Sequence, residues 1–391
     1  MRWFGFGFNA FGQICVQEKS DKEESSDAIT EVKVSHPKEI NCHVDCFSKT
    51  SKIRASWSRR ASLHLDGDTG ACLAGFGTSF SGECCGISAV ESRGCKDASI
   101  SESHLILAFP DRIESWDLQK KDNTPSWSME IKTQSESSDV KFPLVPGGYV
   151  ASKFPFYYSV STHLKAKSLA LGAEHAVLLS ATGAVYTWGQ GSHGQLGHGG
   201  LTSEEEPKAV EALLGMPMNS VASGGWHSVC ISDGGDLYVW GWNESGQLGL
   251  PSRGLGKASQ QKSSQQAELS HDVGTSPGEE LQEGEKHEEV FISIQAFPAL
   301  LDVTPSCEIQ TVSCGSRHTA AVTTTGDLYT WGWGEYGQLG HETLMSSDEP
   351  QRVEFFKAEQ MRVVDVVCGT WNTFAAAVKE KVAPKNTTES T

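Results

Sequence analysis

Apolar and polar residues alternate in short runs along the second half of the chain, and each run ends at glycines. Residues 228–231 alternate small or polar positions with apolar ones, as a half-buried strand does. Residues 232–235 then offer a glycine turn, and residues 236–240 form a second alternating run rich in β-branched and aromatic side chains. The pattern predicts a β-hairpin over residues 228–240.

This hairpin pattern occurs three times with the same internal spacing. Each unit carries Gly-x-x-His, then Tyr-x-Trp-Gly, then Gly-Gln-Leu-Gly, and the three histidines are His175, His227 and His318. A period of about fifty residues made of strands and glycine turns indicates a propeller or a solenoid. Stacking the units is necessary because one hairpin cannot bury its apolar faces alone.

The recurring histidines are not expected to form one active site. Symmetry-related positions lie far apart around a ring, so their side chains cannot meet. We predict that they hold turns through hydrogen bonds.

A fourth unit begins near the C-terminus and stops after one strand. It covers residues 366–378, with Asn372 at the place of the histidine. The missing half resembles the N-terminus, because residues 4–14 repeat the pattern of residues 329–339. We therefore predict that the N-terminal strand completes the C-terminal blade and closes the ring, which removes an open sheet edge.

The repeated Trp-Gly and Gly-Gln-Leu-Gly motifs resemble the regulator-of-chromosome-condensation repeat, a blade of about fifty residues. The resemblance is clear over residues 168–250 and 306–378 and degenerate over residues 53–165. It implies an all-β fold with a single β-propeller over residues 1–378. The units that can be counted give at least six blades, and the family's usual number predicts seven.

Two polar segments lie outside this pattern. Residues 252–290 end in an acidic run and carry few apolar side chains, so they predict a disordered acidic insertion loop within the propeller. Residues 379–391 predict a flexible tail.

Composition narrows the functional classes. The formal net charge of −17 repels phosphate backbones, which argues against direct DNA binding. The 11 cysteines show no ligand pairs at zinc-finger spacing, and no nucleophile and base form a recognisable constellation, so we predict no metal, no cofactor and no catalytic residue. No apolar run reaches membrane-spanning length.

Two sets of residues are candidates for binding a partner. Residues 142–158 belong to no recognisable repeat and carry three prolines, which resist the interior of a sheet. This segment is either a loop or edge strand packed along the propeller, or an extended segment offered to a partner. Its candidate contacts are Tyr149, Lys153, Phe154, Phe156 and Tyr157. The second set is Trp226 and Trp371, in the loops that open their units.

The resemblance is strongest to one chromatin-linked member of the family, through residues 3–9, 222–230, 240–248 and 297–302 and the acidic insertion. It implies a non-catalytic scaffold, monomeric within its complex, that binds a JmjC-domain oxygenase. Effects on histone H3 lysine-36 methylation, transcription and mitotic chromosome segregation would follow. Histones or chromatin would be contacted indirectly, in the nucleus and on chromosomes, with the cytoplasm left open. The alternative is a guanine-nucleotide exchange factor or adaptor for a small GTPase, as in the family's founding member.

Overall fold

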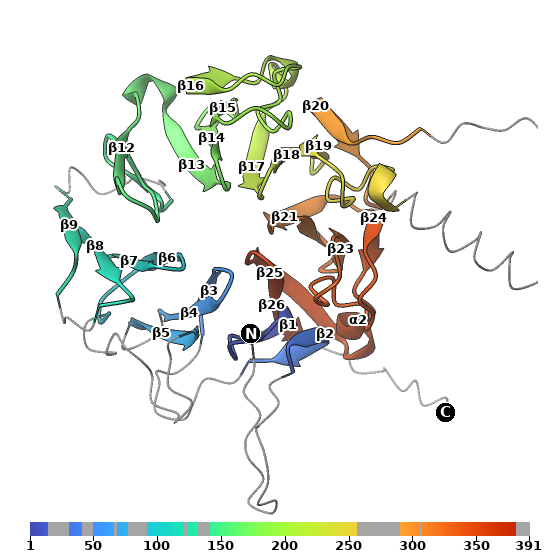
Figure 1. The fold of residues 1–391 in the computed structure, drawn as a ribbon, viewed down its shortest axis with the longest axis horizontal. Coiled ribbons are helices and arrows are strands. Elements are labelled where there is room, and N and C mark those ends of the chain that lie inside the picture. Colours follow the sequence, from blue (N-terminus) through green and yellow to red (C-terminus); the bar gives the residue numbers. More distant parts are fainter. Residues whose placement is uncertain are drawn as a thin grey trace, which may run out of the picture.

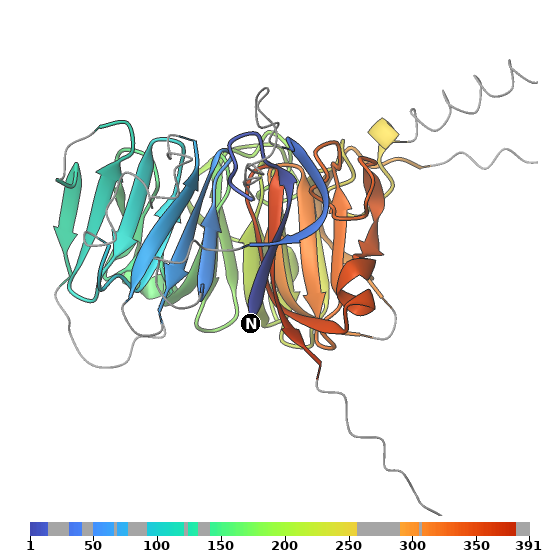
Figure 2. The ribbon, with the colours of Figure 1, turned by 90° about the horizontal axis from the view of Figure 1, so that it is seen from below.

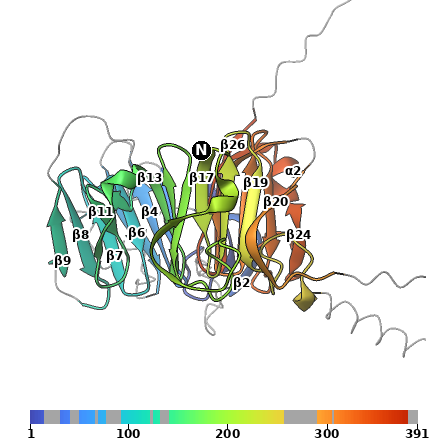
Figure 3. The same cartoon turned by 90° about the horizontal axis from the view of Figure 1, so that it is seen from above.

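The strands of the protein stand side by side in a closed ring. The computed structural model describes residues 1–14, 31–40, 50–65, 69–76, 92–120, 124–131, 141–255, 290–304 and 307–380. Within these ranges seven antiparallel sheets surround a common axis (Figure 1). The strands run through the thickness of a flat disc, and the turns gather on its two faces (Figures 2 and 3). The predicted all-β, seven-bladed propeller is confirmed.

The three clear repeats form four-stranded blades on one plan. From the inner to the outer strand, they are β13 (Ala166–Leu171), β14 (His175–Ser180), β15 (Val185–Gly189) and β16 (Glu204–Ala209); β17 (Met218–Ser223), β18 (His227–Ser232), β19 (Leu237–Trp242) and β20 (Ile294–Leu301); and β21 (Ile309–Cys314), β22 (His318–Thr323), β23 (Leu328–Gly332) and β24 (Ser347–Arg352). The short helix η2 (Glu211–Leu213) precedes the inner strand β17, and α2 (Glu354–Ala358) precedes the inner strand β25 of the last blade.

The N-terminal strand completes the last blade, as the sequence predicts. This clasp blade contains β25 (Met361–Cys368), β26 (Asn372–Lys379), β1 (Arg2–Phe8) and β2 (Lys33–Glu39) in that order. β1 pairs antiparallel with β26, from Arg2 opposite Ala377 to Gly7 opposite Asn372, and Figure 2 shows it running beside the C-terminal strands. The two ends of the chain therefore close the ring by sharing one sheet.

The degenerate region forms the other three blades. Their strands are β3 (Lys52–Ala55), β4 (Arg59–His64) and β5 (Gly70–Gly75); β6 (Asp97–Ile100), β7 (His104–Ala108), β8 (Arg112–Asp117) and β9 (Trp127–Glu130); and β10 (Leu144–Val145), β11 (Gly148–Val150) and β12 (Tyr157–Ser159), followed by η1 (Thr162–Leu164).

The proline-bearing segment of residues 142–158 is the seventh blade. Its prolines fall outside the strands: Pro143 and Pro146 flank β10, and Pro155 lies in the loop before β12. Proline cannot donate to a ladder, so short strands between the prolines are what this sequence allows. The segment therefore forms a blade of its own, with β10 and β12 as edge strands, rather than a loop or an extended arm. Whether it binds a partner stays a prediction.

Most of the predicted insertion (residues 252–290) and most of the predicted tail (residues 379–391) lie outside the described residues. β19 and β20 precede and follow the insertion, and they pair directly in one blade. No helix in the described part of the chain is long and apolar enough to cross a membrane.

Candidate functional site: an aromatic face

One face of the disc collects large side chains from equivalent turns. In four neighbouring blades, the turn between the first and second strands carries such a side chain: Trp57, Trp371, Arg317 and Trp226. The third strands of three of these blades end on the same face, because neighbouring strands are antiparallel. Their ends supply Phe8, Trp333 and Trp242. We call this side the aromatic face.

The rings on this face touch across the blade boundaries. Trp371 of the clasp blade stacks on Tyr336 of the adjacent β21–β24 blade, with ring centroids 5.1 Å apart. Trp57 stacks on Phe8 with centroids 5.8 Å apart and meets Trp371 edge-on at 5.7 Å. Further ring contacts extend the cluster to Phe11, Phe76 and Trp333.

A single cation joins this cluster to a second one. The guanidinium of Arg317 lies 4.9 Å from the ring centroid of Trp242 and 6.0 Å from that of Trp333. Trp242 contacts Trp226 at 5.5 Å, and His193 contacts both indoles. The result is a continuous arc over five adjacent blades, which we call the aromatic arc: Phe8, Phe11, Trp57, Phe76, His193, Trp226, Trp242, Arg317, Trp333, Tyr336 and Trp371.

The arc is exposed at the end formed by the β3–β5 blade. There Phe76 is 54% and Trp57 36% exposed, whereas Phe8 beneath them is buried. The turn that carries Trp57 is fixed by Glu102 of the neighbouring blade, whose carboxylate accepts hydrogen bonds from the backbone N–H of Trp57 at 2.8 Å and of Ser58 at 3.2 Å. Burial disfavours ionisation of Glu102, but these bonds and those from the hydroxyls of Ser56 and Ser58 outweigh it and lower the pKa of the carboxyl. A preorganised pair of exposed rings is a typical binding anchor.

The structure separates the residues of the first candidate set. Tyr149 and Phe156 are buried: Tyr149 packs against Trp188, and Phe156 against His104 and Trp127. They belong to the core because the segment folds as a blade, so neither ring is available as an anchor.

The remaining members of that set reach solvent. Phe154 is 81% exposed, and Lys153 and Tyr157 are exposed as well. The hydroxyl of Ser101 donates to the carbonyl of Ser152 at 3.2 Å, which holds this loop beside the turn between β6 and β7. That turn is equivalent to the one carrying Trp226, so Lys153 and Phe154 lie on the aromatic face, apart from the arc.

The second candidate set lies within the arc. Trp226 and Trp371 are both members, although no direct contact joins them in the described residues. Sequence reasoning missed Trp57, Phe76 and Arg317. A signal was present for Arg317, which directly precedes His318 as Trp226 precedes His227.

The three recurring histidines lie deep between blades. Each ring bonds through Nε2 to a hydroxyl at or next to the start of the second strand of the following blade: His175 to Ser228 at 2.8 Å, His227 to Thr319 at 2.9 Å and His318 to Thr373 at 2.9 Å. Each hydroxyl donates in turn to a backbone carbonyl, those of Gln195, Gln247 and Gln338. Nε2 therefore carries the proton and donates. The histidines hold the structure through hydrogen bonds as predicted, but the bonds join blades rather than turns.

No cluster of three or more His, Cys, Asp or Glu side chains suited to a metal ion occurs in the part of the chain that the structure describes.

Known proteins resemble this chain at the level of both the repeats and the whole propeller. Residues 182–231, 234–266 and 325–376 match the model of the Regulator of chromosome condensation (RCC1) repeat, and a second model of that description matches residues 166–195, 219–247 and 309–338. The chain is 40% identical to RCC1 domain-containing protein 1 of Homo sapiens, over 97% of each chain. Its identity to the protein of that name in Mus musculus is 39%, over 96% of this chain and 97% of the relative.

Among solved structures, Prp20p from Saccharomyces cerevisiae has the same fold. The TM-score is 0.65 over 97% of this chain and 92% of Prp20p, at 16% sequence identity. Together with the near full-length match to the mammalian relatives, the repeats show that this chain belongs to the family of RCC1-repeat β-propeller proteins.

Proposed function

We propose that the chain is a non-catalytic scaffold that binds a protein partner on its aromatic face. The observation that carries this proposal is the aromatic arc, a continuous array of rings that ends in the exposed pair Trp57 and Phe76. Exposed aromatic clusters on a rigid framework mark interaction sites, and tryptophan and tyrosine are enriched among the residues that dominate binding energy.

The partner we propose is a JmjC-domain oxygenase. The resemblance to RCC1 domain-containing protein 1, which covers nearly the whole chain, supports this choice. Through that partner the protein would influence histone H3 lysine-36 methylation, transcription and chromosome segregation, in the nucleus and on chromosomes. The solved relative Prp20p is described with binding properties to histones. A net charge of −17 favours contact with basic proteins over contact with DNA.

Lys153, Phe154 and Tyr157 form the second part of the proposed surface. All three are exposed, and Lys153 and Phe154 lie on the aromatic face, whereas the burial of Tyr149 and Phe156 argues against them as anchors. A replacement of Phe154 alone therefore tests this loop without disturbing the core of its blade.

Replacing Trp57 and Phe76 together by serine should weaken binding of the purified oxygenase by about 700-fold, because two exposed anchors at about 2 kcal/mol each contribute about 4 kcal/mol. Isothermal titration with the full-length chain measures the effect. Leu214→Ser is the matched control, since Leu214 is 61% exposed but lies on the opposite face. Melting curves of all variants report whether they fold.

Phe154→Ser separates the two parts of the surface. If both variants lose affinity, the oxygenase covers both parts of the surface. If only the Trp57 and Phe76 variant loses affinity, the oxygenase covers the arc alone. Binding that survives both changes contradicts the proposal.

The alternative function is nucleotide exchange on a small GTPase. The solved relative Prp20p is described with binding properties to Gsp1p, which favours keeping this candidate. Release of labelled nucleotide from small GTPases, measured with and without the chain, distinguishes it: acceleration supports exchange, and unchanged release supports the scaffold.

A further inference from the structure

The outer strand β20 departs from a pattern that the outer strands of three other blades share. The strands β16, β24 and β2 carry a proline flanked by polar or charged residues, as in Glu206-Pro207-Lys208 and Glu349-Pro350-Gln351. β20 carries its proline at the corresponding place, but between Phe297 and Ala299. Proteins protect exposed sheet edges with charges. β20 lacks this protection.

The register shows that these positions are equivalent. Leu300 pairs with Tyr238 of β19, as Arg352 pairs with Tyr329 and Ala209 with Tyr186 in the neighbouring blades. In β20 the exposed side chains are apolar: Leu300 is 60% and Phe297 54% exposed. Figure 1 shows β20 on the outer rim of the ring, and among the described strands it pairs with β19 alone.

The apolar surface continues onto the neighbouring blade. The hydroxyl of Tyr238, which is paired with Leu300, donates to the Sδ of Met216 at 3.6 Å, and η2 contacts β20. At the other end of the strand, the backbone N–H of Gly199 donates to the carbonyl of Ala296 at 3.0 Å. The wall formed by Phe297, Leu300 and Met216 therefore extends from β20 onto the connection that leads into β17, away from the aromatic arc.

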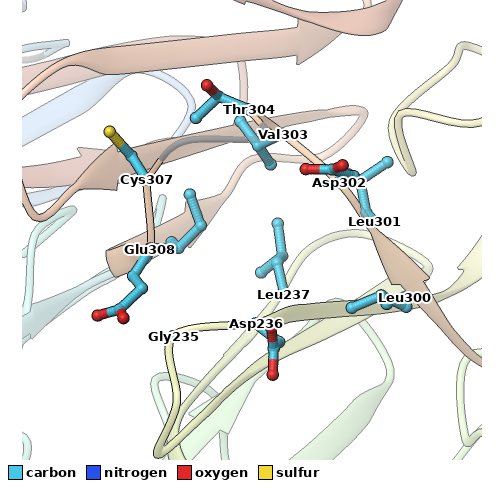
Figure 4. A pocket seen from close by; sticks show the side chains of 11 residues that line it. Gly235, Asp236, Leu237, Leu300, Leu301, Asp302, Val303, Thr304, Cys307 and Glu308 are labelled. Atoms are coloured by element: carbon cyan, nitrogen blue, oxygen red, sulfur yellow. The ribbon is translucent and has the colours of Figure 1, made fainter.

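A pocket with acidic walls lies at the end of this wall. It has a volume of about 490 Å³ and lies between the end of β20 and the turn before β21. Figure 4 shows Leu237 and Val303 pointing toward each other across it, with Asp302 on one side and Glu308 on the other. Leu300 lines both the wall and the pocket, so the two are continuous.

The chemistry of this pocket suits a lysine or arginine side chain. Such a side chain has an apolar stem and a charged head. Leu237 and Val303 match the stem, and the exposed carboxylates of Asp236, Asp302 and Glu308 match the head. No lysine or arginine lines the pocket, and no ion pair engages Asp302 or Glu308 in the described residues.

We propose that the wall and the pocket together bind a peptide segment of a partner protein. Apolar side chains of the segment cover Phe297 and Leu300, and an adjacent lysine or arginine enters the pocket. A second copy of this chain fits less well, because two chains of net charge −17 repel each other and because Pro298 interrupts the edge that a continuous intermolecular ladder needs.

Selection from a random library of 12-residue peptides against the full-length chain tests this proposal. We expect enrichment of peptides in which two apolar residues lie next to lysine or arginine. Affinities of the enriched peptides should fall at least tenfold in Phe297→Glu combined with Leu300→Ala. These replacements introduce residues found at the equivalent positions of β16, Glu206 and Ala209, so the blade should fold, and melting curves verify it.

The charge of the pocket is tested separately. Asp302→Asn combined with Glu308→Gln should weaken the basic peptides at least fivefold and remove most of the salt dependence of their binding. The variant of Trp57 and Phe76 should bind them as the wild type does. A negative result at this wall therefore does not contradict the aromatic-face proposal, and a negative result on the aromatic face does not contradict this one.

Three results would overturn the inference. The selection could yield no enrichment over background. The enriched peptides could bind the Phe297 and Leu300 variant as tightly as the wild type. Sedimentation could show a dimer that Phe297→Glu dissociates, which would assign the wall to a second copy.

Discussion

Deletion of residues 1–14 should open the propeller and remove most of its thermal stability. The segment supplies strand β1, whose loss exposes the whole edge of β26. It also removes Trp3, Phe4 and Phe6 from the core of the clasp blade. Each buried aromatic contributes about 3–5 kcal/mol, against a total stability of about 5–15 kcal/mol, so the truncated ring should not survive as a cooperative unit.

A single replacement tests the same idea in the full-length chain. Phe6 is fully buried, and Phe6→Ala should cost about 3–5 kcal/mol in the free energy of unfolding measured with urea. Phe11→Ala is the matched control: Phe11 follows β1, contributes to the aromatic arc and is only partly buried. A truncated protein that melts within a few degrees of the intact one would refute the clasp.

The part of the fold that could be predicted is the part whose sequence repeats regularly. The three clear blades and the clasp follow from repeated glycines and aromatic residues whose spacing is set by the chain itself. Phe6 shows this well, since it was matched to Trp331 by spacing, and both side chains are completely buried. The blade that contains β10–β12 was expected only from the family's usual number of seven. Its strands could not be located in the sequence, because they have two or three residues and prolines separate them.

The candidate site depends on contacts between residues of different blades, which no single stretch of sequence shows. Trp226 and Trp371 stand out because their units are clear. Their connection runs through Tyr336, Trp333, Arg317 and Trp242, and it exists only once the blades are set side by side. Trp57 is a stronger candidate than either, yet its unit is too degenerate to align. The exposed apolar edge of β20 was not predicted, because apolar residues in a strand normally indicate burial in the core.

The histidine network should make the propeller unstable in mild acid. Burial is the main cause that lowers the pKa of these imidazoles, to about 4 for His175 and to about 3 for His227 and His318. The ordinary value in the unfolded chain is 6.5. The unfolded state therefore binds more protons below pH 6.5. The stability that depends on neutral histidines is fully present above pH 6.5 and is lost as the pH falls toward 4.

The expected size of this effect is large. The unfolded imidazole is half protonated at pH 6.5, so each histidine loses about 1 kcal/mol of stability between pH 6.5 and 5.5, and the three together lose about 3 kcal/mol. Protonation also places a charge on Nδ1, which is buried and has no hydrogen-bond partner in any of the three rings. Asp365 acts in the opposite direction, because burial raises the pKa of its carboxyl. His198 and His341 act in the same direction as the three histidines, because burial lowers the pKa of their rings as well.

Replacing one histidine should remove about a third of the part of the pH dependence that the three inter-blade histidines contribute. The fourth unit carries Asn372 at the same position, so His227→Asn introduces a side chain that the propeller already accommodates there. Urea unfolding at pH 7.5, 6.5 and 5.5 measures the slope. The variant should be less stable than the wild type at pH 7.5, because the bond to Thr319 is lost, but its stability should fall less steeply on acidification. The exposed residue His163 provides the control, and His163→Asn should retain the wild-type slope. Equal slopes in the wild type and His227→Asn would show that acid acts elsewhere in the ring.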